Sequence, residues 1–174
     1  QAPTQQRLIS GVAAVDLFEK RLGQMDKALE VLGGLHRAGL STLPVRERLA
    51  AIAARARSWS EATAMLEELM GERASAEGRI AAARLAMAIW RDELREPTKA
   101  RKAVSKLLEE APTDGEAIDL VLSLGTGEPW VEKLLAASRG ALVLALSAGK
   151  LDPESVSRLA RIARKVDDAP LVQA

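Results

Sequence analysis

The chain has 174 residues, with 25 Lys and Arg against 24 Asp and Glu, a single His and no Cys. This length is enough for one domain with a sizeable core, and the lack of Cys excludes disulfides, thiolate nucleophiles and zinc sites that use cysteine. The balanced charge gives no global attraction for nucleic acid or anionic membranes, so any such binding has to be local.

The apolar content is mostly alanine and aliphatic, since hydrophobic residues make up 48% of the chain and aromatic residues only 2%. Ala and Leu favour helix, and little in this composition favours strand. We therefore expect an all-α protein. The 32 Ala, and the 17 Arg against 8 Lys, are typical of a GC-rich bacterial genome.

Neither a membrane span nor a signal peptide is predicted. Apolar runs fall short of the roughly 20 residues that a span needs, and the start QAPTQQRLISG lacks the basic-then-apolar order of a signal peptide. The start at Gln1 instead of Met favours a fragment or a processed chain. Cytoplasm and periplasm both fit a cysteine-free chain, and we favour the cytoplasm.

Helix starts are marked by several local signals. Ser58 and Thr113 each stand three residues before a Glu, a pattern in which hydroxyl and carboxylate satisfy the exposed amides of a helix start. Asp152 is a predicted N-cap. Prolines suit the first turn, where the missing N–H has no helical partner, and those in suitable places are Pro44, Pro97, Pro129 and Pro153.

Apolar residues recur at helical spacing between these signals. They predict about ten helices joined by connections of a few residues, so that successive helices pack antiparallel as hairpins. The predicted helices lie near residues 4–22, 25–38, 44–57, 59–71, 76–95, 97–110, 114–124, 128–138, 140–148 and 152–167.

Three segments resemble one another: DKALEVLGGL, SEATAMLEEL and TKARKAVSKL. Each has an Ala, then Leu or Val four residues later, then Leu three residues after that. The alanines are Ala28, Ala62 and Ala100, which are spaced by 34 and 38 residues, and a further 34 reaches Leu134. A helix hairpin repeated at this period is typical of a helical solenoid, and the alanines are the predicted points of close helix contact.

The segment TKARKAVSKLLEEAPTDGEA resembles a tetratricopeptide repeat (TPR), with Ala100, Val104, Leu107 and Pro112 at the family's small, apolar and repeat-ending proline positions. The match is best over 79–117, fair over 9–75 and poor beyond 118. The family's small position in the first helix reads Asp16, Ala50, Ala88 and Leu122, and its aromatic position is not filled. The resemblance implies one TPR-like domain over 1–174, a right-handed superhelix of four to five hairpins, with 118–174 as a divergent repeat or a helical cap.

Catalytic chemistry is not indicated. His36 is the only His, and its setting LGGLHRAGL predicts a helix-terminal residue beside the negative end of the helix dipole. Gly125-Thr126-Gly127 lacks the preceding strand and the following Lys of a phosphate-binding loop, so we expect a turn. Neighbouring Glu pairs, at 67–68 and 109–110, point in different directions on a helix surface. We expect no enzyme activity, cofactor or metal.

The last predicted helix is basic and amphipathic. Arg158, Arg161, Arg164 and Lys165 lie along one side, and Leu159, Ile162 and Val166 on the other. One interpretation is a surface for an acidic partner, a membrane surface or nucleic acid. The other, which we favour, is a solenoid cap with its polar face outward.

The three tryptophans are predicted to pack. Trp90 lies on an apolar stripe at helical spacing and is expected in the core. Trp59 precedes Ala62 by three residues, and Trp130 precedes Leu134 by four. We therefore expect both rings to fill the space between the two helices of a hairpin. The alternative is that either ring lines a binding pocket.

The TPR-like register implies a concave groove for an extended peptide or a partner helix. We expect a non-catalytic protein-interaction scaffold; the alternative is nucleic-acid or anionic-surface binding through residues 158–165. No cluster of Lys and Arg indicates a carboxylate clamp, so an amphipathic helix, a mixed-charge segment or another copy of the chain is the expected guest, rather than nucleic acid. The groove residues implied are Ala13, Leu17, Glu47, Ala51, Arg55, Ala82, Leu85, Ile89, Asp92 and Asp119.

Overall fold

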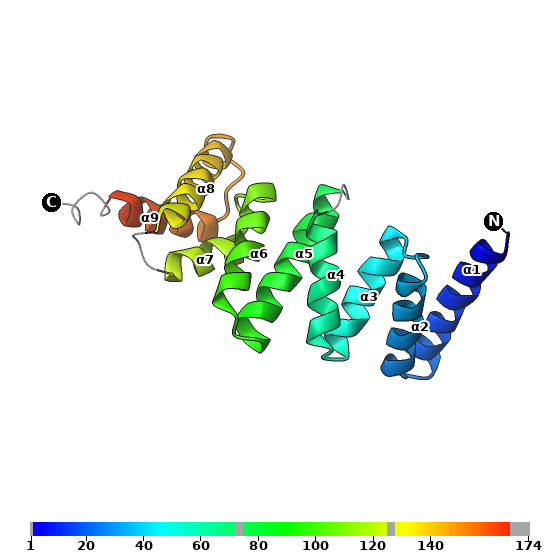
Figure 1. Cartoon of the computed structure of the whole chain (residues 1–174). Coiled ribbons are helices and arrows are strands. Elements are labelled where there is room, and N and C mark those ends of the chain that lie inside the picture. The colour runs from blue at the N-terminus through cyan, green and yellow to red at the C-terminus, as the bar shows by residue number, and fades with distance from the viewer. Residues whose placement is uncertain (1, 72–74, 125–127, 168–174) are drawn as a thin grey trace. The chain divides into compact units, whose positions relative to one another are not determined.

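A computed structural model describes residues 2–71, 75–124 and 128–167 (Figure 1). These residues form nine α-helices and two π-helical turns, with no strand among them. The helices divide into two compact units, Gln1–Arg95 and Glu96–Ala174. The predicted all-α class is thereby confirmed.

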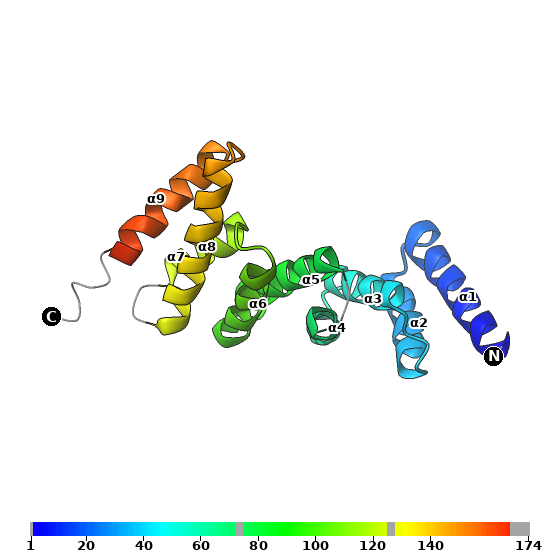
Figure 2. The same cartoon turned by 90° about the horizontal axis from the view of Figure 1, so that it is seen from above.

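The first unit contains five helices in which each packs against the next along the chain (Figures 1 and 2). π turns at Leu17–Arg21 and Ile89–Glu93 continue the first and the fifth helix without a break. The helices are α1 (Ala2–Asp16), α2 (Met25–Arg37), α3 (Leu43–Arg55), α4 (Trp59–Gly71) and α5 (Ala76–Ala88).

The second unit packs differently, because its last helix contacts two others (Figure 2). Here α9 lies against both α7 and α8, while α6 also contacts both of these helices. The bounds are α6 (Pro97–Glu110), α7 (Gly115–Ser123), α8 (Pro129–Ser147) and α9 (Pro153–Asp167). The stacking of all the hairpins into one superhelix stays a prediction.

The helix count differs from the predicted ten because Gly140 does not break a helix. Instead of two helices over 128–138 and 140–148, α8 runs through this glycine. Leu135 precedes Gly140 and Leu142 follows it, and both leucines are buried on the same face of α8. Their packing outweighs the roughly 0.5–1 kcal/mol by which a mid-helix glycine disfavours a helix.

The helix starts follow the predicted signals with one shift. Pro44, Pro97, Pro129 and Pro153 all lie in first turns, and Asp152 Oδ1 accepts a hydrogen bond from the Ser155 amide at 2.8 Å. The cap of α7 is Asp114 rather than Thr113, since Asp114 Oδ1 accepts from the Ala117 amide at 3.0 Å. At the start of α4, the Ser58 hydroxyl donates to Glu61 Oε2 at 2.9 Å.

The core is built from the aliphatic and alanine positions that the periodicity indicated. Ala28 and Ala62 are completely buried and Ala100 nearly so. Trp90 is 1% exposed, which confirms it as a core residue. The three alanines are therefore buried in α2, α4 and α6, as the sequence pattern predicts.

Candidate interaction groove

Two adjoining pockets lie along α3 and α5 in the first unit. The first has a volume of about 240 Å³, with walls from α3 and α5 and a contribution from α4. Its lining consists of Leu, Ala and Gly residues and one carboxylate. The lining residues are Glu47, Ala50, Ala51, Leu66, Leu69, Gly78, Ala81, Ala82 and Leu85.

The second pocket has a volume of about 290 Å³ and shares Leu85 with the first. It is formed by the end of α3, the start of α4, the end of α5 and the π turn that follows. Because the two pockets meet at Leu85, we treat them as one feature, the α3–α5 groove. The second lining comprises Ala54, Arg55, Trp59, Leu85, Ala88, Ile89, Asp92 and Glu93.

Most of the predicted groove residues meet here. Ala82 and Ile89 are buried, whereas the others on these helices are exposed or half-buried. The seven that line the α3–α5 groove are Glu47, Ala51, Arg55, Ala82, Leu85, Ile89 and Asp92.

The other three predicted groove residues lie elsewhere. Ala13 and Leu17 are exposed on α1 and its π turn, outside both pocket linings. Asp119 belongs to α7 in the second unit, where it accepts hydrogen bonds from Arg158 and Arg161.

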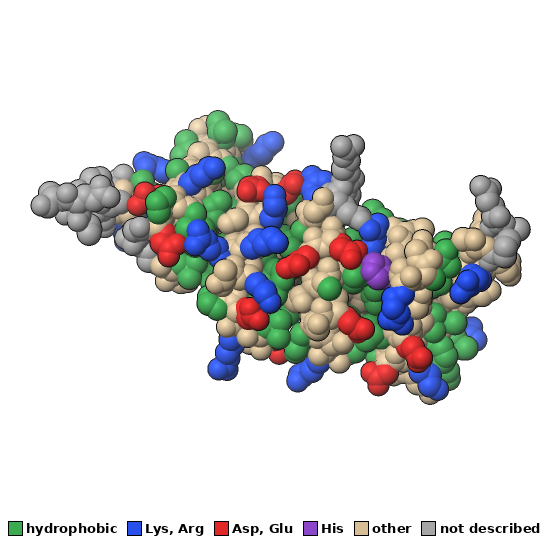
Figure 3. All heavy atoms as spheres, in the orientation of Figure 1, with side chains coloured by type: hydrophobic (Ala, Val, Ile, Leu, Met, Phe, Trp, Pro, Cys, Tyr) green, Lys and Arg blue, Asp and Glu red, His purple; other side chains and the backbone are tan. Residues whose placement is uncertain are grey.

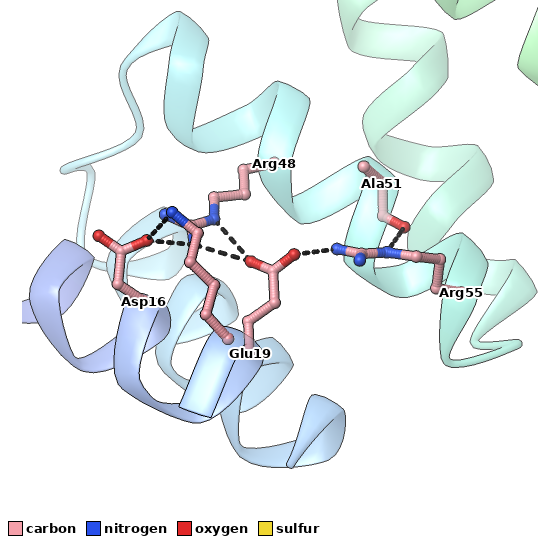
Figure 4. A network of polar contacts seen from close by, with 6 residues as sticks. Asp16, Glu19, Arg48, Ala51 and Arg55 are labelled. Carbon is pink, nitrogen blue, oxygen red and sulfur yellow. Dashed lines mark hydrogen bonds and ion pairs between the residues drawn. The ribbon is translucent and has the colours of Figure 1, made fainter. Parts of the chain in front are cut away.

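An ion-pair network beside the groove joins α3 to the end of α1 (Figure 4). Arg48 Nη2 lies 2.6 Å from Asp16 Oδ1 and 2.7 Å from Glu19 Oε2, and Arg48 Nε donates to Glu19 Oε2 at 3.0 Å. Arg55, which lines the groove, donates to the other oxygen of Glu19. Glu19 therefore holds one α3 arginine with each carboxylate oxygen, and it orients Arg55.

These contacts shift the ionisation of the network. Hydrogen bonds from Arg55 and then from Arg48 lower the pKa of Glu19, and outweigh the effect of burial. Arg48 and Lys20 lower the pKa of Asp16 in the same way. Burial acts to lower the pKa of Arg48, but hydrogen bonds to Glu19 and Asp16 outweigh it and the pKa is raised. Asp16, Glu19 and Arg48 are thus held in their charged forms.

In the second pocket, which Arg55 also lines, Asp92 is held ionised as well. Arg91 Nε lies 2.6 Å from Asp92 Oδ1, and the hydrogen bond from this neighbour lowers the pKa of Asp92. Asp92 and Glu93 both line the second pocket, whereas Glu47 lines the first. Carboxylates are therefore present in both pockets.

Trp59 and Trp130 each line a surface pocket. Trp59 contributes to the α3–α5 groove. In the second unit, Trp130 borders a pocket of about 200 Å³ between the starts of α6 and α8. The Arg101 guanidinium lies 4.2 Å above its ring centre, and Glu128 accepts hydrogen bonds from both Arg101 and the Trp130 indole. Both tryptophans are half-buried, so one side of each ring system packs while part stays accessible.

The basic side of α9 is largely engaged within the second unit. Arg158 Nε donates to Asp119 Oδ2 at 3.0 Å, and Arg161 Nη1 donates to Asp119 Oδ1 at 2.6 Å. Lys165 donates to the backbone carbonyl of Leu122. The hydrogen bond to Asp119 raises the pKa of Arg158. Three of the four basic residues predicted on this side thus bond to α7 and its C-terminal end.

His36 lies in the last turn of α2, which confirms the helix-terminal prediction. Its Nδ1 is 3.0 Å from the Ser41 hydroxyl, and its Nε2 is 3.7 Å from Glu68 Oε1. Among the described side chains, no three His, Asp or Glu residues gather in a way that could hold a metal ion. The Gly125–Gly127 turn prediction falls outside the described residues.

Charge on the visible surface is mixed, with Lys and Arg interspersed among Asp and Glu (Figure 3). None of the described helices combines the length and the apolar content of a bilayer span. Comparison of the chain with models of protein families, with curated proteins and with solved structures gives no match. The TPR resemblance therefore stays a prediction from the sequence.

The contacts of Glu19 with Arg48 and Arg55 had no sequence signal. Arg48 and Arg55 are 29 and 36 positions from Glu19, so neither pair has the helical spacing of three or four that marks a local ion pair. They come together only in the folded chain, in which α2 packs against both α1 and α3.

Proposed function

We propose that the protein is a non-catalytic interaction scaffold that binds a peptide or a helix of a protein partner in the α3–α5 groove. The observation that carries this proposal is the meeting of seven register-predicted residues in two adjoining pockets. Those residues were selected from the sequence as one concave face, and a shared binding surface accounts for their common location.

The dimensions of the groove support a polypeptide guest. The groove is a succession of two pockets, of about 240 and 290 Å³, that follow each other along α5. A row of small apolar pockets suits side chains that project from one face of a helix. Ala51 and Ala81 are exposed and have short side chains, so the backbone of a guest can approach the groove closely.

The alternative, nucleic-acid or anionic-surface binding through residues 158–165, has less support. Arg158, Arg161 and Lys165 would have to exchange their bonds to Asp119 and the Leu122 carbonyl for phosphates. Such binding would also weaken steeply with salt.

The proposal is tested by selecting binders from a display library of random helix-forming peptides on the full chain. Selected peptides are then measured against Ala51→Trp and Ala81→Trp, which place a bulky ring in the groove from exposed positions and leave the core unchanged. The matched control is Ala64→Trp, an exposed alanine on α4 that lines neither pocket.

We expect the two groove variants to lose at least tenfold in affinity for most selected peptides and the control to lose little. Selected peptides that bind all three variants equally would overturn the groove assignment. A single-stranded oligonucleotide and anionic vesicles, tested in parallel at two salt concentrations, would support the alternative if they bound in place of peptides.

A further inference from the structure

We infer that the segment bound in the α3–α5 groove is a basic amphipathic helix with two apolar anchors about two turns apart. The inference rests on the proposed function and names the chemistry of the partner. Two features of the groove carry it, which are the spacing of the pockets and the signs of the charges that line them.

The spacing of the pockets follows from their residues on α5. The first pocket uses α5 from Gly78 to Leu85, and the second begins at Leu85 and extends to Asp92 and Glu93 in the π turn. The pockets are thus displaced by about seven residues, or roughly 10 Å at the 1.5 Å rise of a helix. A guest helix lying along α5 presents side chains i and i+7 on one face at the same separation.

The anchors are expected to be aliphatic. Aliphatic side chains line both pockets: Leu66, Leu69 and Leu85 in the first, and Leu85 and Ile89 in the second. An aliphatic side chain entering either pocket removes apolar surface from water on both sides of the contact. The apolar anchors supply contact area, and the charges around them decide which helix binds.

The charges that line the groove are mainly negative. Its lining residues include three carboxylates, from Glu47, Asp92 and Glu93, and the guanidinium of Arg55. Arg55 donates to Glu19, whose negative charge offsets the positive charge of Arg55. In the same way, Arg91 offsets part of the negative charge of Asp92. Arg84 is exposed on α5 but belongs to neither lining.

The acidic residues stand in both pockets, so they flank both anchors. Lys or Arg side chains beside each anchor meet Glu47 in the first pocket and Glu93 in the second. Acidic residues at the same positions of a guest would meet like charges. Complementary charge of this kind selects the partner and its orientation more than it adds affinity.

The test uses three labelled synthetic peptides of 18 residues and the full chain. The first has Leu at i, i+4, i+7 and i+11 with Lys on the other face, the second replaces each Lys by Glu, and the third scrambles the first so that Leu surrounds the helix. Binding is measured by fluorescence anisotropy. We expect the basic amphipathic peptide to bind at least tenfold more tightly than either of the others.

The charge assignment is tested with the double variant Glu47→Lys and Glu93→Lys, which is expected to reverse the preference towards the acidic peptide. Its control carries the same change in net charge at exposed sites outside both linings, Glu30→Lys with Glu67→Lys. The control is expected to keep the preference for the basic peptide. An equal reversal in the control would overturn the inference, because it would mean a general charge effect.

The two levels of the proposal fail in different ways. If the acidic peptide binds as well as the basic one and Ala81→Trp blocks both, the groove binds peptides but the inferred partner chemistry is wrong. If neither these peptides nor any library-selected binder responds to Ala81→Trp, the proposed function fails and the inference fails with it.

Discussion

Arg158 of α9 donates a hydrogen bond to Asp119 of α7 across 3.0 Å, although the two residues are 39 positions apart. The Arg158 side chain is only 15% exposed, so water screens this pair less than a pair on an open surface. The contact ties the last helix of the second unit to its α7. Arg158, one of the basic residues of α9, therefore has a structural role within the second unit.

Removal of this pair is expected to destabilise the second unit. Arg158→Gln and Asp119→Asn should each lower the free energy of unfolding by about 1 kcal/mol, with a coupling of about 0.5–1 kcal/mol between them. Urea unfolding of both single variants and the double variant measures the coupling. Arg164→Gln, an exposed site on the same helix, serves as the control. Strict additivity of the two changes would mean that the bond contributes nothing.

Glu19 is expected to make the first unit sensitive to acid. Arg55 and Arg48 lower its pKa in the folded protein below the ordinary value of 4.5, so the unfolded chain binds its proton more tightly. The resulting stabilisation is complete above about pH 5 and is lost as the pH falls through the folded pKa. Glu19→Gln should lower stability at pH 7 by about 1 kcal/mol and flatten the dependence of stability on pH below 4.5.

The measurement for Glu19 is chemical unfolding of the wild type and of Glu19→Gln from pH 3 to pH 7. Their stability curves should converge at the acid end, where the wild-type carboxylate is protonated as well. Curves that stay parallel over the whole range would contradict the assigned role. Glu67→Gln, which removes an exposed carboxylate on α4, is measured in parallel as the control.

Two glycines within helices are expected to respond in opposite ways to alanine. A Cβ at Gly140 would meet nothing within 4 Å, whereas one at Gly11 would lie 2.9 Å from the nearest carbon of Leu35, a buried residue of α2. Gly140→Ala should therefore stabilise the protein by about 0.5–1 kcal/mol. Gly11→Ala should destabilise it by about 1 kcal/mol, because Leu35 has to move.

Thermal and urea unfolding of both glycine variants compare these effects directly. Since both substitutions add the same methyl group to a helix, the sign of the difference reports the space around each site. Stabilisation by Gly11→Ala equal to that of Gly140→Ala would show that α1 and α2 do not approach as closely as described.

The repeating alanines are expected to be intolerant of larger residues. Ala62 is completely buried in α4, so Ala62→Leu should overpack the helix crossing and lower stability by roughly 1–3 kcal/mol. Ala64, two residues later, is exposed, and Ala64→Leu should change stability by less than about 0.5 kcal/mol. Urea unfolding distinguishes the two, and equal effects would argue against a crowded crossing at Ala62.

Helix boundaries were predictable because local chemistry marks them. The range predicted as 97–110 coincides with α6 (Pro97–Glu110), since Pro97 suits a first turn and Ala-Pro follows the end. Of the two failures, one is local and the other comes from tertiary packing. Thr113 and Asp114 are both able to cap α7, and the sequence does not decide between them; at Gly140, core packing overrides the low helix propensity of glycine.

The groove was predictable in part, because residues on one face of α3 or α5 follow helical periodicity. What periodicity does not contain is the relation between elements distant in sequence. Glu19 and Arg55 are joined only once α1 and α3 have both packed against α2. Asp119, predicted for the groove, is instead an acceptor for α9. From the sequence these charged residues are expected to be exposed to solvent, whereas in the fold they form ion pairs.

The π turn at Leu17–Arg21 has a dynamic consequence for the groove. Glu19 lies within this last turn of α1, which the Leu22 amide closes by bonding the Leu17 carbonyl at 3.1 Å. Helix ends fray before helix centres do, and hydrogen exchange at their amides is correspondingly fast. When this turn frays, the Glu19 carboxylate moves away from Arg55 and no longer orients it. The Arg55 guanidinium is then free to rotate where it lines the second pocket. The electrostatic state of the groove is therefore linked to the local opening of a helix end that does not itself line it.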